Sequence, residues 1–145
     1  MEESINRYIR ESFGIEEQDI KTYSPLVLAY IGDSVYDLIV RSAVVDRENN
    51  KPDTLHKYCC GIVNAGAQAR FIESIEEHLT KEEADVFRRG RNAKSSSVAK
   101  NASVSDYRKA TGFEALIGYL YMTDRFDRII ELLKIGKVFE DKEER

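Results

Sequence analysis

The segment at residues 28–40 reads LAYIGDSVYDLIV and places an acid, Asp33, directly after a glycine within an otherwise apolar helical run. A carboxylate flanked by so much apolar surface is costly to desolvate unless a positive charge or a hydrogen-bond donor meets it. Residues 107–121 repeat the pattern, because Glu114 is the one acid in the run YRKATGFEALIGYLY. Two apolar helices that each carry one inward acid predict a shared carboxylate site, which a bound metal ion would stabilise.

Apolar residues recur at three- and four-residue steps along most of the chain, which predicts an all-α fold. The helix at 26–41 is apolar nearly all round and is therefore expected to be buried at the centre. The other expected helices are those at 52–75, from a capping box at Thr80 and Glu83 to residue 87, from a cap at Ser103 and Asp106 through Glu114, and at 125–133. The 145 residues are expected to form a single domain, 1–145, with a charged tail at 137–145.

The composition excludes an integral membrane protein. Hydrophobic residues make up 42% of the chain and charged residues 33%. No apolar run approaches the roughly 20 residues that a membrane span requires. The N-terminus MEESINRYIRESF lacks the features of a signal peptide, so the cytoplasm is the expected location. Cys59 and Cys60 are adjacent, which matches neither a disulfide-closed loop nor a C-x-x-C site.

Positive charge is concentrated at residues 88–109, which contain seven basic residues and one acid. This window therefore has a net charge of +6, whereas the whole chain has a net charge of −4. Residues 88–105 are rich in Gly, Ser, Asn and Ala, which predicts a long loop. Lys and Arg beside neutral donors suit a sugar-phosphate backbone, whereas a solvated flexible loop is the alternative interpretation. The candidate RNA-binding residues are Arg88, Arg89, Arg91, Lys94, Lys100 and Arg108.

Helical phase indicates which other polar groups share a face with the acids. Asp37 follows Asp33 by four residues and is therefore a candidate to support the metal ligands from one turn away. Asn64 and Gln68 have the same spacing on the next predicted helix. They are candidates to orient ligands or to contact RNA, and ordinary hydrogen bonding between helices is the alternative.

The two acidic motifs together resemble the ribonuclease III family. IGDSVYDLIV is similar to the family signature, a Gly-Asp pair within a long apolar helix, and GFEALIGYLY is similar to the second motif, which carries the other essential acid. The run LHKYCCGIVNAGAQARFI resembles the middle helix of the family, and the resemblance covers residues 20–135. Two further acids that are usual in the family are replaced here by Ala29 and Thr111.

The chain also ends before a double-stranded-RNA-binding domain. With these two replacements, it resembles the mini-ribonuclease III subfamily. The resemblance implies a homodimer with the helical endonuclease fold of ribonuclease III. It implies a metal-dependent endoribonuclease that cleaves double-stranded RNA and leaves 5′-phosphate and 3′-hydroxyl ends. The expected substrate is the precursor of 23S ribosomal RNA, matured at both ends, with a ribosomal protein on the precursor as a further candidate partner.

The resemblance also implies that Asp33 and Glu114 are catalytic and bind Mg²⁺, with Mn²⁺ as a substitute. Magnesium prefers oxygen ligands and keeps several waters, so two carboxylates and a substrate phosphate form a sufficient set. Tyr30 and Tyr36 are candidates for the dimer interface or for the core. The alternative function is a catalytically inactive RNA-binding dimer in ribosome assembly. A helical nucleotide hydrolase, and a purely structural role of Asp33 and Glu114 in bonding helix ends, are the remaining interpretations.

Overall fold

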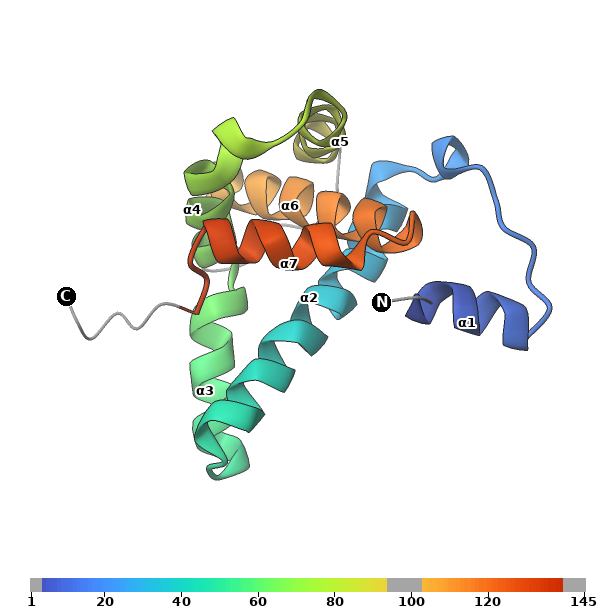
Figure 1. Ribbon diagram of the computed structural model, residues 1–145. Coiled ribbons are helices and arrows are strands. Elements are labelled where there is room, and N and C mark those ends of the chain that lie inside the picture. The colour runs from blue at the N-terminus through green and yellow to red at the C-terminus, as the bar shows by residue number, and fades with distance from the viewer. Residues whose placement is uncertain (1–3, 94–102, 140–145) are drawn as a thin grey trace.

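The computed structural model describes residues 4–93 and 103–139, and this part of the chain is all-helical, as predicted (Figure 1). Its elements are α1 (Ile5–Ser12), η1 (Ile20–Thr22), α2 (Pro25–Glu48), α3 (Pro52–Val63), α4 (Ala65–Ile75), η2 (Glu76–His78), α5 (Lys81–Asn92), α6 (Val104–Met122) and α7 (Phe126–Ile135). Residues 140–145 of the expected charged tail lie outside the described residues. None of the helices within the described ranges is long and apolar enough to cross a membrane.

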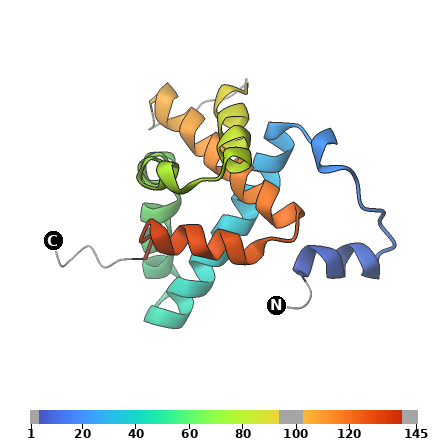
Figure 2. The same ribbon diagram turned by 45° about the horizontal axis from the view of Figure 1, so that its top comes forward.

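The central helix is α6, not the helix that starts near residue 26. α2, α4, α5 and α7 all pack against α6, and nine of its residues between Ala110 and Leu120 are buried. α2 crosses α6, as both Figure 1 and Figure 2 show, but it leaves Val27, Tyr30 and Leu38 exposed. The expectation that the helix at 26–41 is buried all round is therefore wrong for the single chain. An apolar pattern does not distinguish burial within one chain from burial against a second chain.

Two glycines bring the backbones of α2 and α6 into direct contact. A Cβ atom on Gly32 would lie 1.8 Å from the backbone oxygen of Glu114, and one on Gly118 would lie 1.9 Å from that of Leu28. Both positions therefore require a residue without a side chain. The crossing fixes the register of the two helices, and with it the positions of Asp33 and Glu114.

The helix expected at 52–75 is divided at Asn64. The backbone of Asn64 is extended, with φ −69° and ψ 162°. Its side chain accepts a hydrogen bond from the Ala67 N–H at 2.8 Å and donates one to the Cys60 carbonyl at 2.9 Å. One amide thus caps the end of α3 and the start of α4, because Asn competes with the helix for backbone hydrogen bonds.

The capping box at Thr80 and Glu83 starts α5 as predicted, and the Ser103 hydroxyl accepts from the Asp106 N–H at the start of α6. α5 then continues to Asn92, so the loop expected to begin at residue 88 starts later than predicted. The physical reason is packing: Gly90 is buried, and a Cβ atom there would lie 2.9 Å from the Gly112 Cα of α6. Contact with α6 therefore stabilises one more turn of α5, beyond residue 88.

Candidate active site

The two signature acids meet where α2 crosses α6. Asp33 follows Gly32, the residue that touches the backbone of Glu114, and the two carboxyl groups hydrogen-bond to each other. Asp33 is exposed, whereas Glu114 is largely covered by the surrounding helices. The prediction that both acids are buried among apolar residues is therefore correct for Glu114 and wrong for Asp33, which is exposed in the single chain.

Burial, together with the charge of Asp33 and its hydrogen bond, raises the pKa of Glu114 to about 8. At neutral pH the Glu114 carboxyl group of the metal-free chain is therefore mostly protonated and donates to the Asp33 carboxylate. A divalent cation in place of that proton would relieve the repulsion between two carboxylates. The donor set is hard oxygen, which suits Mg²⁺. The residues present thus fit a magnesium ion held by Asp33 and Glu114.

Among the residues that the structure describes, no third carboxylate joins this pair. Asp37 forms an ion pair with Arg41 at 3.0 Å, so its carboxylate already has a cationic partner on its own helix. Ala29 is buried, and the Thr111 hydroxyl donates to the Tyr107 carbonyl at 3.0 Å. Within the described ranges, no group of three or more His, Cys, Asp or Glu side chains could hold a metal ion. Further ligands would therefore come from water and from substrate phosphate.

Gln68 of α4 also reaches this site, and the sequence indicated it only through its spacing from Asn64. The side chain is 1% exposed and hydrogen-bonds to Glu114, an interaction that lowers the pKa of Glu114 against the larger effects of burial and Asp33. An amide within the apolar run AGAQARFI was the available signal, since buried polar groups require partners.

The two tyrosines of the signature helix have different environments. Tyr36 is 1% exposed and packs edge-on against the ring of Phe113, with the ring centroids 4.9 Å apart. Burial raises the pKa of its hydroxyl group. Tyr30 is 82% exposed. Tyr36 is therefore a core residue that supports the neighbour of Glu114, and Tyr30 is the one of the two that an interface could cover.

The basic candidates that can be described lie on helices. Arg88 pairs with Asp85, and the Arg91 guanidinium lies 5.7 Å from the centroid of the Phe87 ring. Arg89, on α5, and Arg108, near the start of α6, are exposed. The other two candidates, Lys94 and Lys100, lie outside the described residues.

The contact between α5 and α6 brings these arginines to the level of the acids. Gly90 sits between Arg89 and Arg91, and a Cβ atom there would lie 2.8 Å from the Ala115 Cβ. Ala115 adjoins Glu114. The arginine-bearing end of α5 is therefore level with the acid pair along the axis of α6.

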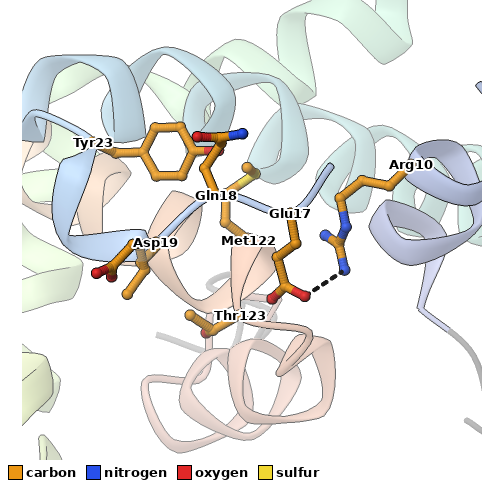
Figure 3. A pocket seen from close by; sticks show the side chains of 8 residues that line it. Arg10, Glu17, Gln18, Asp19, Tyr23, Met122 and Thr123 are labelled. Atoms are coloured by element: carbon orange, nitrogen blue, oxygen red, sulfur yellow. Dashed lines mark ion pairs between the residues drawn. The ribbon is translucent and has the colours of Figure 1, made fainter. Parts of the chain in front are cut away.

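A cavity of about 480 Å³ lies elsewhere, where the segment after α1 passes the end of α6. Figure 3 shows the ion pair of Arg10 and Glu17 on one side of it and Tyr23 on the other, with Met122 between them. Neither Asp33 nor Glu114 lines this cavity. The acid pair therefore lies apart from this cavity, at the crossing of α2 and α6.

Comparisons with known proteins identify the family to which a chain with these two acidic helices belongs. The ribonuclease III domain family matches residues 26–125. A mini-ribonuclease 3 of Clostridium tetani is 48% identical over 120 residues, covering 82% of this chain and 80% of that one. One of Thermoanaerobacter sp. is 42% identical over 136 residues, covering 94% and 96%. A crystal structure of a Fusobacterium nucleatum protein matches with a TM-score of 0.74 at 30% identity, covering 81% of this chain and 94% of that one. The chain therefore belongs to the ribonuclease III family, within its mini-ribonuclease III group.

Proposed function

We propose that this chain is a magnesium-dependent endoribonuclease that cleaves double-stranded RNA. The observation that carries the proposal is the hydrogen-bonded pair of Asp33 and Glu114, held by the backbone contact at Gly32 in a chain of the ribonuclease III family. Two carboxyl groups at one helix crossing have little structural purpose, because the charge of Asp33 makes Glu114 costlier to ionise.

In the proposed reaction, Asp33 and Glu114 would hold the metal ion. The bound ion supplies polarisation of the phosphoryl oxygens and lowers the pKa of water. Glu114 must lose its proton before it can act as a ligand, and the neighbouring Asp33 carboxylate accepts a hydrogen bond from it until then. The expected products carry 5′-phosphate and 3′-hydroxyl ends. Mn²⁺ is expected to replace Mg²⁺, since both bind carboxylate oxygens.

We further propose that the active form is a homodimer paired through α2. The exposed apolar residues on one face of this helix are Val27, Tyr30, Leu38 and Val45. Their spacing returns to the same side of the helix, next to the side that carries Asp33. A second copy paired along this face would cover apolar surface that the single chain leaves in water. It would also bring two acid pairs to one RNA duplex.

The proposed substrate is the precursor of 23S ribosomal RNA, which the chain would mature at both ends. Duplex RNA is recognised through its phosphates, its 2′-hydroxyls and its shape. The arginines at the end of α5, level with the acids, suit that surface. A ribosomal protein on the precursor is a further proposed partner, since such a protein would fix the shape of the cleavage site.

One specific observation supports a second candidate, an RNA-binding dimer without catalysis: Ala29 and Thr111 stand where the family usually has acids. Labelled double-stranded RNA incubated with Mg²⁺ distinguishes the two. Cuts that disappear in Asp33→Asn and Glu114→Gln, while binding persists, support the endonuclease. Binding without cleavage, on the ribosomal precursor with its proteins as well, supports the binding module.

A further inference from the structure

Gln68 is one of three polar or charged side chains that are buried in the described part of the chain, beside Asn6 and Glu83. The other two have evident structural roles. Asn6 donates to the Met122 carbonyl, and Glu83 completes a capping box and pairs with Arg128. Gln68 needs its own explanation, because a leucine would occupy a similar volume in an apolar helix without burying an amide.

The amide of Gln68 is oriented by the break between α3 and α4. In a continuous helix the Val63 carbonyl would accept from the Ala67 N–H. Here Asn64 takes that N–H, and the freed Val63 carbonyl accepts from Gln68 Nε2 at 2.9 Å. A carbonyl oxygen accepts only, so the atom that faces Val63 must be the nitrogen of the amide. The Asn64 cap thereby fixes which way the Gln68 side chain is turned.

The second N–H of the same nitrogen is then available to Glu114, to which Gln68 hydrogen-bonds. A carboxylate oxygen that accepts from Gln68 is satisfied without a proton. A cation bound by Glu114 is therefore directed to the side that faces Asp33. The Gln68 Oε1 atom has no hydrogen-bond partner within the described part of the chain. Burying an acceptor without a partner is unfavourable, and a purely structural role of Gln68 does not explain it.

We propose that Gln68 is a positioning residue of the active site, which holds the Glu114 carboxylate as an acceptor turned toward Asp33 and so prepares it to bind the divalent cation. Asn64 acts one step further away, by freeing the Val63 carbonyl that orients the amide. The inference rests on the proposed function, since it assigns the purpose of the bond to the metal site proposed there. It adds a residue outside the two acidic motifs.

The test compares Gln68→Met, which keeps an unbranched side chain of similar size, with the native chain and with Ile72→Val. Ile72 is fully buried on the same helix, so its variant controls for loosened packing. Binding of Mn²⁺ is measured by electron paramagnetic resonance without RNA. Gln68→Met is predicted to weaken Mn²⁺ binding about tenfold, as removal of a group that orients a metal ligand commonly does. Ile72→Val is predicted to leave it unchanged.

Cleavage kinetics provide a second measurement, the Mg²⁺ concentration needed for half-maximal cleavage, which loosened packing alone would not change. Gln68 is buried, so KM for RNA is predicted to stay the same at saturating Mg²⁺, while the Mg²⁺ concentration needed for half-maximal cleavage rises. Unchanged Mn²⁺ affinity in Gln68→Met overturns the inference. Should that variant fail to fold, Asn64→Ala decides by the same measure, because it leaves Gln68 in place but releases the cap that orients it.

A separate measurement distinguishes failure of the proposed function from failure of the positioning role of Gln68. In the native chain, both side-chain amide protons of Gln68 are predicted to show hydrogen-bonded shifts by NMR. Glu114→Ala is predicted to abolish the shift of the proton that does not bond to Val63, with or without metal. If the native chain binds no Mn²⁺, the proposed function fails. If the amide proton does not respond to Glu114→Ala, the positioning role fails, whatever the metal does.

Discussion

Gly32 of α2 lies against the backbone of Glu114 so closely that a Cβ atom would come within 1.8 Å of the Glu114 oxygen. This contact joins the two acidic motifs, because Asp33 is the next residue along α2. The register of the carboxylates is thus set by the backbones of two helices and not by the side chains alone.

Gly32→Ala is therefore expected to force α2 and α6 apart. A loss of about 3 kcal/mol in the free energy of unfolding is expected, at the upper end of the usual cost of overpacking, because the clash is with backbone. Cleavage should be lost as well. Gly61→Ala is the matched control: it lies within α3 with no atom within 4 Å of a new Cβ, so up to about 1 kcal/mol of stabilisation is expected. Equal effects of the two variants in chemical denaturation would contradict this account.

The raised pKa of Glu114 makes the stability of the metal-free chain depend on pH. The pKa is about 8 in the folded chain, against an ordinary value of 4.5. The folded state therefore holds its proton more tightly than the unfolded state, and stability is expected to fall as pH rises from about 4.5 through about 8. Thermal unfolding in a metal chelator measures this fall. Glu114→Gln should flatten it, and parallel curves for the two proteins would show that Glu114 is not its source.

The arginines at the end of α5 are expected to bind phosphate. Arg89→Gln and Arg91→Gln should each weaken RNA binding to a similar extent on different duplex sequences, and each should lower the slope of log affinity against log salt by roughly one. Lys81→Gln, at the opposite end of the same helix, is the control and should change neither quantity. Fluorescence anisotropy over a range of salt concentrations measures both, and a slope unchanged in the arginine variants would exclude them as phosphate contacts.

Pairing through α2 can be tested at Tyr30. A charge placed in the middle of an apolar interface is costly to bury, so Tyr30→Asp is expected to shift the chain from dimer to monomer in analytical ultracentrifugation. Tyr8→Asp changes another exposed tyrosine, on α1, and should leave the assembly state unchanged. A native chain that is monomeric at micromolar concentration would contradict the homodimer itself.

The fold class and the two acids were predictable because both rest on local pattern. Apolar spacing determines the helices, and an acid within such a run is visible without a structure. The division at Asn64 was not predicted, because one side chain there outcompetes a continuous helix. The extent of α5 was missed for a different reason: packing of Gly90 against α6 overrides a composition that is typical of loops.

The candidate site was predicted in part. Asp33 and Glu114 meet as expected, but the sequence could not indicate that Gln68 reaches Glu114, because that contact depends on how α4 is turned by the break before it. Nor could it separate Tyr36 from Tyr30: both lie in one apolar run, and only the packing against Phe113 shows that one is core and the other surface.

The most direct test of the central claim is cleavage of an end-labelled RNA duplex with Mg²⁺ by the native chain, Asp33→Asn and Glu114→Gln, with binding measured in parallel. The account predicts cuts with 5′-phosphate ends for the native chain, and a loss of at least a hundredfold in rate for either variant with RNA affinity retained. Cleavage that survives both substitutions, or a native chain that binds duplex RNA with Mg²⁺ and never cuts it, would contradict the assignment of these two acids as the catalytic metal ligands.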